Sequence, residues 1–289
     1  MNPDISFSVI IPSFNRRKYL IDTLKCLERQ SIHPNEAIVV DASLSEYRLA
    51  KADLDEFSFQ LKYIEWDEIG NICKQRNHAI GIAESDYILF LDDDVEFDSD
   101  LLENFKKAFE ETGADGISGN VATPKRPRGS PPLWHTGFLN EMDEPNIQTC
   151  DFIADTRIIC TASFAVKKDA LKAIGGFDLN QRGTLDDVEA GFRLSAAGYR
   201  IIHHPLPEVL HFQAPMSGAR DSKNGPIWNL ENQIYFQLKH RYKSRNALLV
   251  KVILSMFRPS RDWLKPINNL RRYLIMFKAI SRATTLLAK

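Results

Sequence analysis

The sequence predicts an α/β protein with a mostly parallel sheet, helices on its faces and a helical extension at the C-terminus. Short apolar runs alternate with stretches of helical periodicity through the first half of the chain, which is typical of βαβ units. The 289 residues, 44% hydrophobic and 26% charged, are enough to bury a large core. Residues 226–289 differ from the rest in charge, which separates the extension from the body.

The first half contains five apolar, β-branched runs that predict strands. These runs are residues 7–11, 37–40, 61–66, 87–91 and 116–121. Leucines at helical spacing follow the first run, at Leu20, Leu24 and Leu27, and Leu101 and Phe105 begin a similar pattern after the fourth. In parallel sheets, ligands bind outside the carboxyl ends of the strands. The strand ends here, "IPSFN", "VVDAS" and "LFLDDD", turn polar at that edge.

The second half mixes one long loop with further strands and helices. Residues 123–132, "TPKRPRGSPP", lack periodicity and predict a mobile loop. Residues 155–166 predict a strand, and a short helix follows that ends at the Gly175–Gly176 pair. A further helix is expected over 187–197, closed by Gly198, and then the strand "YRIIHHP".

The formal net charge of -1 hides two oppositely charged regions. Residues 226–289 hold 13 of the 37 Lys and Arg but only 2 of the 38 Asp and Glu. An acidic body therefore carries a basic tail, whose residues also show apolar stripes at helical spacing.

The cysteines and the hydropathy of the chain indicate a cytoplasmic protein. Cys26, Cys73, Cys150 and Cys160 lie far apart and form no CxxC pair, which argues against zinc ligation and a secreted disulfide scaffold. The N-terminus passes directly into a strand pattern, and no run of eighteen apolar residues occurs. We expect reduced thiols and no membrane span.

Asp92, Asp93 and Asp94 directly follow the fourth predicted strand. Because side chains alternate along a strand, Asp92 and Asp94 would share a face while Asp93 points away. Two carboxylates a few ångströms apart repel by about 4 kcal/mol at an effective dielectric near 20, and a cation between them reverses that sign. Mg²⁺ or Mn²⁺ prefers such oxygen ligands together with phosphate and water. The triplet therefore favours a divalent-cation site.

Two other interpretations of the acidic run compete with this one. Acidic residues after a strand also solvate loops, with Asp98 or Ser99 capping the next helix, and the run alone does not separate this from a metal site. The spacing also matches the ligand positions of an EF-hand calcium loop. That interpretation fails because Phe97 stands where the loop needs glycine and a strand, not a helix, precedes it.

Five segments in a fixed order carry a resemblance to a known family. They are residues 8–16 ("SVIIPSFNR"), Asp41, Arg76 in "KQRNHAIGIAESDYILFLDDD", the triplet itself, and residues 173–201 ("AIGGFDLNQRGTLDDVEAGFRLSAAGYRI"). Over roughly residues 5–215, the chain resembles the family 2 glycosyltransferases. The resemblance implies the Rossmann-like GT-A fold and transfer of a sugar from a nucleotide diphosphate donor with inversion at the anomeric carbon.

The resemblance places part of the donor site at the ends of the first two strands. Pro12, Ser13, Asn15 and Arg16 would shape the loop under the nucleotide, with Arg16 near the phosphates. Asp41 would accept a hydrogen bond from the uracil N–H, a role that suits a carboxylate. An ordinary loop aspartate is the alternative for that position.

By the same resemblance, the triplet and two more residues complete the donor and metal site. Arg76 would contact the donor, with a helix-surface ion pair as the alternative. Asp92 would face the ribose or the water shell of the metal, and Asp94 would bind the metal, whereas Asp93 has the least defined role. His211, expected just after the last strand, would lie close to the metal or the diphosphate, although a lone histidine is more often structural.

The pair Asp186 and Asp187 stands where the family usually has Glu-Asp. The resemblance makes Asp187 the general base that takes the proton of the acceptor hydroxyl, because an alcohol is a poor nucleophile at neutral pH. The shorter Asp186 in place of glutamate leaves its partner open. Both residues can also cap a helix N-terminus. Trp134 and His135 are further candidates for the acceptor site, with core packing as the alternative for the tryptophan.

The expected reaction is thus Mg²⁺- or Mn²⁺-dependent transfer from a UDP-sugar to a hydroxyl of a glycan or lipid-linked glycan, in polysaccharide or glycolipid assembly. A dTDP-sugar offers the same N–H as uracil, and a GDP-sugar fits Asp41 less well. A nucleotidyltransferase is the rival enzyme, but "IPSFNRRKY" has no glycine-rich phosphate loop. A non-catalytic carbohydrate-binding homologue is the other alternative, against which the acidic metal and base positions argue.

The expected domains are a catalytic domain over 1–225 and a basic amphipathic extension over 226–289. Within the first, about 1–98 would bind the nucleotide-sugar and 99–225 the acceptor. The extension would contact an anionic membrane peripherally, at about 1 kcal/mol per basic residue, or pack as a lid, or form a homodimer contact. Nucleic acid is not expected, since few aromatics interleave with the basic residues. The basic residues that flank the apolar stripes of the extension, and that would face the membrane, are Lys243, Lys251, Arg258, Arg271, Arg272, Lys278 and Arg282.

Overall fold

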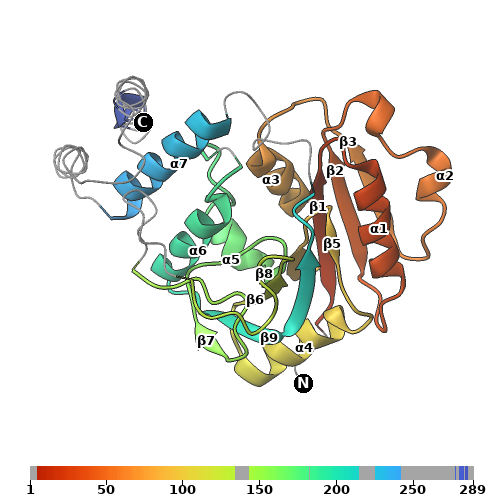
Figure 1. Cartoon of the computed structure of the whole chain (residues 1–289). Coiled ribbons are helices and arrows are strands. Elements are labelled where there is room, and N and C mark those ends of the chain that lie inside the picture. The colour runs from red at the N-terminus through yellow and green to blue at the C-terminus, as the bar shows by residue number, and fades with distance from the viewer. Residues whose placement is uncertain are drawn as a thin grey trace.

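A central sheet with helices on both faces organises the chain (Figure 1). The computed structural model describes residues 5–133, 143–181, 183–214 and 225–241, the last range with side chains from residue 231 on, and residues 277, 280–282 and 284–285. Within these residues the sheet has nine strands in the order β3-β2-β1-β4-β8-β6-β9-β5, with β7 paired to β9. The predicted α/β class is confirmed.

The predicted elements of the first half are present almost residue for residue. The strands are β1 (Phe7–Ser13), β2 (Glu36–Asp41), β3 (Leu61–Glu65), β4 (Tyr87–Phe90), β5 (Val95–Glu96), β6 (Gly116–Ala122), β7 (Ala154–Asp155), β8 (Phe164–Lys167) and β9 (Ile201–His211). The helices are α1 (Arg17–Glu28), α2 (Lys51–Leu54), α3 (Ile72–Ile82), α4 (Leu101–Thr112), α5 (Lys168–Ala173), α6 (Asp186–Ala196) and α7 (Gly225–His240), with a 3₁₀ turn at Ser45–Tyr47.

Two hydrophobic clusters hold the helices on opposite faces of the sheet. Side chains alternate along β1, so Val9 and Ile11 lie in the cluster with α1 and α4, whereas Ile10 lies in the cluster with α3, α5 and α6. Leu20 and Leu24, predicted from helical spacing, are fully buried. The apolar periodicity therefore decides which face each helix covers.

The sheet is parallel only in part. β3, β2, β1 and β4 are all parallel, and β6 is parallel to β9, but β8 runs antiparallel to both of its neighbours and β5 antiparallel to β9. The sheet also curls, since β5 follows β4 closely in the chain yet pairs with the end of β9. The end of β9 therefore lies near the carboxyl end of β4, and the Thr23 hydroxyl of α1 holds β5 by donating to the Val95 carbonyl over 2.9 Å.

The strand predicted over 155–166 is wrong for most of its length. Only Asp155 and the last residues of that range lie in strands, β7 and β8, and turns connect them. The Glu144 carboxylate accepts hydrogen bonds from the backbone N–H of Arg157 (2.6 Å) and of Ile158 (3.0 Å). Because a side chain satisfies these backbone donors, they form no hydrogen bonds to a neighbouring strand, and this stretch is not part of the sheet.

The tail begins as a helix packed on the body. Phe236 of α7 is fully buried and meets Phe192 of α6 edge-to-face at 5.0 Å between ring centroids. Of the basic residues predicted to flank the later stripes, Arg282 is described and pairs with Glu231 of α7 at 2.8 Å, and the others lie outside the described residues. None of the helices in the described part of the chain has the length and apolar composition needed to cross a membrane.

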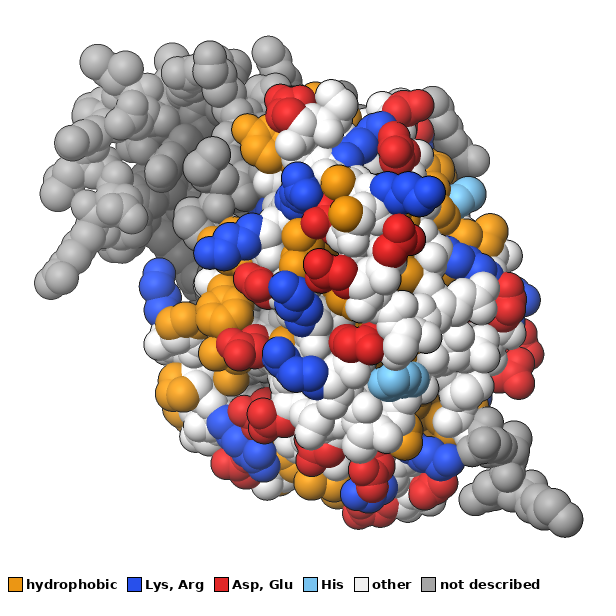
Figure 2. Space-filling view, turned by 90° about the vertical axis from the view of Figure 1, so that its right-hand side faces the viewer, with side chains coloured by type: hydrophobic (Ala, Val, Ile, Leu, Met, Phe, Trp, Pro, Cys, Tyr) orange, Lys and Arg blue, Asp and Glu red, His pale blue; other side chains and the backbone are white. Residues whose placement is uncertain are grey.

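Figure 2 shows the face of the molecule that carries α1 and α2. Acidic and basic side chains are interspersed over it, and hydrophobic side chains lie between them singly or in small groups. A surface that gathers nucleic acid carries a basic stripe or patch. On this face the charges of opposite sign alternate and do not gather into such a stripe.

Candidate active site

The polar ends of the first strands share one edge of the sheet, as predicted. Ser13 at the end of β1 lies in register with Asp41 at the end of β2. Pro12, one position earlier, is buried and pairs in register with Val40. The Ser13 hydroxyl donates to Asp93 over 2.8 Å, so the turn after β4 meets the same edge.

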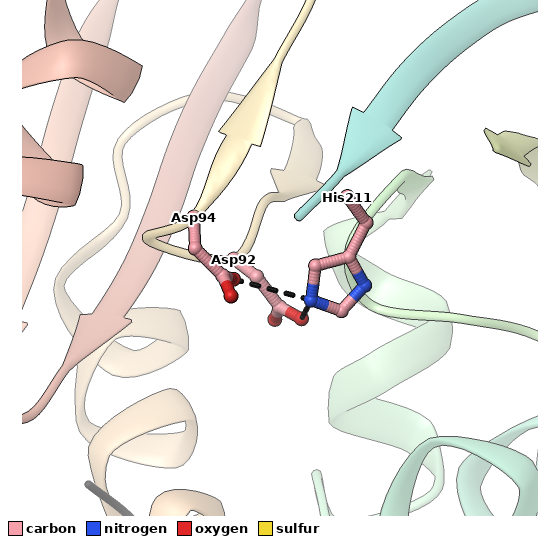
Figure 3. Close-up of side chains that lie close together, drawn as sticks. All are labelled: Asp92, Asp94 and His211. Atoms are coloured by element: carbon pink, nitrogen blue, oxygen red, sulfur yellow. Dashed lines mark ion pairs between the residues drawn. The ribbon is translucent and has the colours of Figure 1, made fainter. Parts of the chain in front are cut away.

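Asp92, Asp94 and His211 converge at this edge (Figure 3). The aspartates lie in the turn between β4 and β5, and His211 is the last residue of β9, not a residue after it, held opposite Val95 by the β5–β9 pairing. His211 Nε2 lies 3.1 Å from Asp94 Oδ1 and 3.6 Å from Asp92 Oδ2. One ligand atom from each residue lies within 4.8 Å of the others.

This trio fits a divalent cation. Asp94 Oδ1 is buried and accepts no hydrogen bond of normal geometry, so a buried oxygen remains available for a further positive ligand. Burial opposes ionisation of Asp94, but the imidazole of His211, 3.1 Å from Oδ1, together with Arg16, holds the pKa of that carboxyl below its ordinary value. Two carboxylates and an imidazole suit Mn²⁺ or Mg²⁺.

Asp93 is buried and has partners outside the trio. Its carboxylate accepts from Ser13 and lies 3.0 Å from the Arg16 guanidinium, which also lies 3.2 Å from Asp94. Burial raises the pKa of Asp93 to about 7 against the opposing charge of Arg16. Arg16, expected near the donor phosphates, therefore sits against the acidic triplet at the edge of the trio.

Asp41 is buried and organises the loop that follows β2. Its carboxylate accepts hydrogen bonds from the backbone N–H of Ser43 (2.9 Å), the Ser43 hydroxyl and the Tyr63 hydroxyl (2.5 Å). The Ser43 hydroxyl in turn accepts from the Asn15 N–H over 2.6 Å, and the Asn15 side chain accepts from the Leu44 N–H over 2.9 Å. Asn15 takes the left-handed conformation (φ 54°) that this turn requires.

Arg76 forms a buried bridge between the two halves of the chain. Its guanidinium, on α3, pairs with Asp186, donates to the Thr161 hydroxyl over 2.6 Å and lies 3.7 Å from Asp92. The guanidinium also lies over the Phe177 ring, 5.2 Å from its centroid. The arginine thus joins the acidic triplet to the Asp-Asp pair. Its ion pair is buried, so the alternative of a pair on the helix surface is wrong.

Asp187 stands in the first turn of α6, which begins one residue earlier than predicted. One carboxylate oxygen accepts from the N–H of Val188 over 2.8 Å. Burial, with the negative charges of Asp186 and Asp92, raises the pKa of Asp187. A half-buried carboxyl with such a pKa is a competent proton acceptor.

Sequence reasoning missed two residues beside this pair. Thr161 binds Arg76, and Cys160 lies close enough that the charges of Asp187 and Asp92 add to burial in raising the pKa of its thiol. Both fall in the segment misread as a strand, so their place was hidden. Trp134 and His135 lie outside the described residues. The Cys26, Cys73 and Cys150 thiols are buried and, like Cys160, free.

Comparison with known proteins gives a consistent result. A family model described as glycosyl transferase family 2 matches residues 8–175. The chain is 28% identical over 239 residues to a chondroitin synthase of Pasteurella multocida, covering 70% of this chain and 24% of the relative. It is 36% identical over 103 residues to the amylovoran biosynthesis glycosyltransferase AmsB of Erwinia amylovora, covering 35% and 34%.

A third relative is an N-acetylglucosaminyl-diphospho-decaprenol L-rhamnosyltransferase of Mycobacterium tuberculosis, 29% identical over 107 residues, with 37% of this chain and 33% of the relative covered. The chain therefore spans between about a quarter and about a third of the length of these relatives.

Solved structures share the fold. Staphylococcus aureus TarS 1–349 in complex with UDP-GlcNAc superposes with a TM-score of 0.61 at 17% identity, over 96% of this chain and 80% of that one. GalNAc-T7 with UDP, GalNAc and Mn²⁺ gives 0.67 at 13% identity, over 82% and 48%. The mannosyltransferase PcManGT of Pyrobaculum calidifontis, with GDP-Man and Mn²⁺, gives 0.60 at 16%, over 99% and 76%. The predicted GT-A fold is confirmed.

Proposed function

Since the chain belongs to glycosyl transferase family 2, we propose that it transfers a sugar from a nucleotide diphosphate donor to a hydroxyl acceptor, with inversion at the anomeric carbon. The observation that carries this proposal is the Arg76 bridge. One buried guanidinium contacts Asp186 and lies 3.7 Å from Asp92. A cation-binding trio and a carboxylate with a raised pKa thereby belong to one site.

The cation is held by Asp92, Asp94 and His211 in this proposal. When bound, Mn²⁺ or Mg²⁺ supplies positive charge against the departing diphosphate. Arg16 lies beside the same carboxylates, within reach of a phosphate on that side, and Asp93 fixes its position. Arg76 keeps Asp92 and Asp186 in their relative places.

Asp187 is the proposed general base. Its raised pKa reflects a destabilised anion, so taking the proton of an acceptor hydroxyl is favoured more than for an ordinary aspartate. Asp186 is the proposed support of this residue, because its own carboxylate is engaged by Arg76. The attacking oxygen then approaches the anomeric carbon on the side opposite the departing diphosphate.

The donor site extends along the strand ends to Asp41. Pro12, Ser13, Asn15 and Asp41 would form the surface under the nucleotide, with a UDP-sugar as the expected donor. Three hydrogen bonds already reach the Asp41 carboxylate, whose two oxygens accept about four. One further acceptor position therefore remains for a uracil N–H, and weaker UDP binding by an Asp41→Asn variant would support the assignment.

The acceptor is proposed to be a glycan or a lipid-linked glycan in polysaccharide or glycolipid assembly at the cytoplasmic face of a membrane. The M. tuberculosis relative is named for a diphospho-decaprenol substrate, which is a precedent for a lipid-linked acceptor. Peripheral membrane contact through the extension remains a proposal. Sedimentation with anionic liposomes, with and without residues 242–289, would test it, and equal sedimentation of both forms would exclude it.

The test of the function is transfer or hydrolysis of nucleotide sugars. A panel of UDP-, dTDP- and GDP-sugars with Mn²⁺ is screened first by thermal shift, where a ligand at a hundred times its Kd stabilises by about 2.7 kcal/mol. The binding donors are then assayed with and without EDTA. We expect activity that EDTA abolishes and that an Asp187→Asn variant loses by at least about a hundredfold.

The controls separate this proposal from the two alternatives. Asp169→Asn on α5 removes a carboxylate in the first turn of another helix and should leave activity unchanged. Full activity of Asp187→Asn would remove Asp187 from its role. Donor binding without any turnover would favour a non-catalytic homologue. Nucleotidyltransferase activity is disfavoured by the family to which the chain belongs.

A further inference from the structure

Helix α7 presents one continuous polar and aromatic face to the segment that carries the proposed base. Asn232, Tyr235, Phe236, Lys239 and His240 recur at helical spacing along it. Phe236 anchors this face in an apolar cluster with Ile158, Val188 and Phe192. The polar members all contact residues 178–189, here called the 178–189 segment. It comprises the end of the loop after α5 and the first turn of α6, and it contains Asp186 and Asp187.

Lys239 joins the two ends of the 178–189 segment. Its ammonium lies 2.6 Å from Asp178 Oδ2 and 2.7 Å from Glu189 Oε1. The Tyr235 hydroxyl donates to the same oxygen of Asp178 over 2.8 Å. The Glu189 side chain is fully buried and is also bound by Arg193 over 2.8 Å. A single lysine thus closes a loop of eleven peptide bonds around the proposed base.

A third contact lies in the middle of the segment, immediately before the base. The Asn232 side-chain amide donates to both the carbonyl (3.1 Å) and the hydroxyl (2.8 Å) of Thr184. The next residue, Leu185, is left-handed with φ of 60° and caps α6 without a side-chain hydrogen bond. A leucine keeps this strained conformation only where the surrounding contacts offset its cost. Asn232 holds the residue directly before it.

We propose that Lys239 and Asn232 are positioning residues for the transfer reaction, which fix the 178–189 segment so that Asp187 faces the acceptor hydroxyl. The proposal rests on the role of Asp187 given above. Neither residue touches the reacting atoms. The first helix of the basic tail, α7, therefore acts on the catalytic site through the 178–189 segment, independently of what the later part of the tail contacts.

A purely structural role would predict a different outcome from a positioning role. If α7 only covers an apolar patch, loss of Lys239 lowers stability and leaves the turnover of the folded enzyme unchanged. If Lys239 positions the base, turnover falls while donor and metal affinity persist, because the residues proposed to bind donor and metal lie on β1, β2, α3, the turn after β4 and the end of β9, outside the 178–189 segment. Misplacement of a catalytic group by about 1 Å costs up to about a hundredfold in rate.

The variants are Lys239→Met, Lys239→Arg and Asn232→Ala in the full chain. The matched control is Arg282→Met, which breaks the 2.8 Å ion pair with Glu231 on the same helix but away from the 178–189 segment. We expect Lys239→Met and Asn232→Ala to lower kcat about 10- to 100-fold, with the KM for the donor and the Kd for Mn²⁺ within about twofold of wild type. Lys239→Arg should recover most of the loss, since its guanidinium can bridge two carboxylates.

Hydrogen exchange provides the readout that does not depend on activity. Backbone amides of residues 184–190 should exchange faster in Lys239→Met and Asn232→Ala than in wild type and in Arg282→Met. If wild type shows no transfer but this exchange difference appears, the proposed function fails and the positioning contact stands. If exchange and kcat of both variants equal those of Arg282→Met, the positioning role is excluded. If Lys239→Met does not fold, Asn232→Ala decides between the two outcomes.

Discussion

Replacement of Glu189 by glutamine should change how stability depends on pH. Burial alone would raise the pKa of Glu189, but His240, Arg193 and Lys239 outweigh it and lower the pKa from the model-compound value of 4.5 to about 2. The folded state thus binds fewer protons than the unfolded state between these two values. Glu189 stabilises the protein above the unfolded pKa, and this contribution is lost as the pH falls toward about 2.

The magnitude follows from the two pKa values. With 4.5 in the unfolded and about 2 in the folded state, the linkage relation gives a loss on the order of 1 kcal/mol between about pH 6 and about pH 3.5. The full contribution would be about 3 kcal/mol, but most of it disappears at lower pH. Because the side chain is fully buried, little of this is screened by solvent.

Urea unfolding of wild type and Glu189→Gln at the two pH values measures this difference. Other carboxylates contribute equally to both proteins, so the wild type should lose on the order of 1 kcal/mol more than the variant on acidification. Glu103→Gln is the control, since Glu103 is on the surface and pairs with Lys107 one turn away. Parallel losses of stability in wild type and Glu189→Gln would refute the reasoning, because Glu189 would then titrate alike in both states.

Three further predictions follow from the fold and the site. Phe236→Ala should destabilise the protein by about 3–5 kcal/mol in urea unfolding, whereas Phe277→Ala, at a side chain 45% exposed, should cost below about 0.5 kcal/mol. Asp94→Asn should weaken Mn²⁺ binding at least about tenfold by calorimetry, and Glu96→Gln, exposed on the next strand, should not. Because the pKa of Asp187 is raised to about 7, kcat should fall as the pH drops below this value, and a flat profile down to about pH 5 would contradict its role as the base.

Patterns in the sequence predicted those site residues whose neighbours are close in the chain or lie at the ends of adjacent strands. The acidic run directly after a buried strand pointed to Asp92 and Asp94 as a pair, and they lie together although a turn and not an extended strand carries them. The rule that parallel strands end at one edge brought Ser13 and Asp41 beside the triplet. Helical spacing gave the buried faces of α1 and α4. In each case the relevant neighbours are a few residues apart or belong to equivalent positions of adjacent strands.

The remainder depends on pairings that no local pattern contains. Arg76 and Asp186 are 110 positions apart, and nothing at either position distinguishes this buried pair from two surface charges. Residues 155–166 read as a strand because the pattern cannot reveal that Glu144 takes the backbone donors of Arg157 and Ile158. Lys239 looks like one more basic residue of a charged tail until Asp178 and Glu189 are seen on either side of it.

The charges of the site itself argue that a cation completes it. Asp92, Asp93 and Asp94 lie with Asp186 and Asp187 around two arginines and one histidine, so the carboxylates outnumber the positive groups. Burial raises the pKa values of Asp93 and Asp187, and the neighbouring carboxylates add to this rise. Burying like charges together costs free energy that a fold built only for stability would avoid. A divalent ion beside Asp92 and Asp94 would offset the excess at the place where the diphosphate of a nucleotide sugar would need positive charge, so the same charge balance would serve both the fold and the proposed reaction.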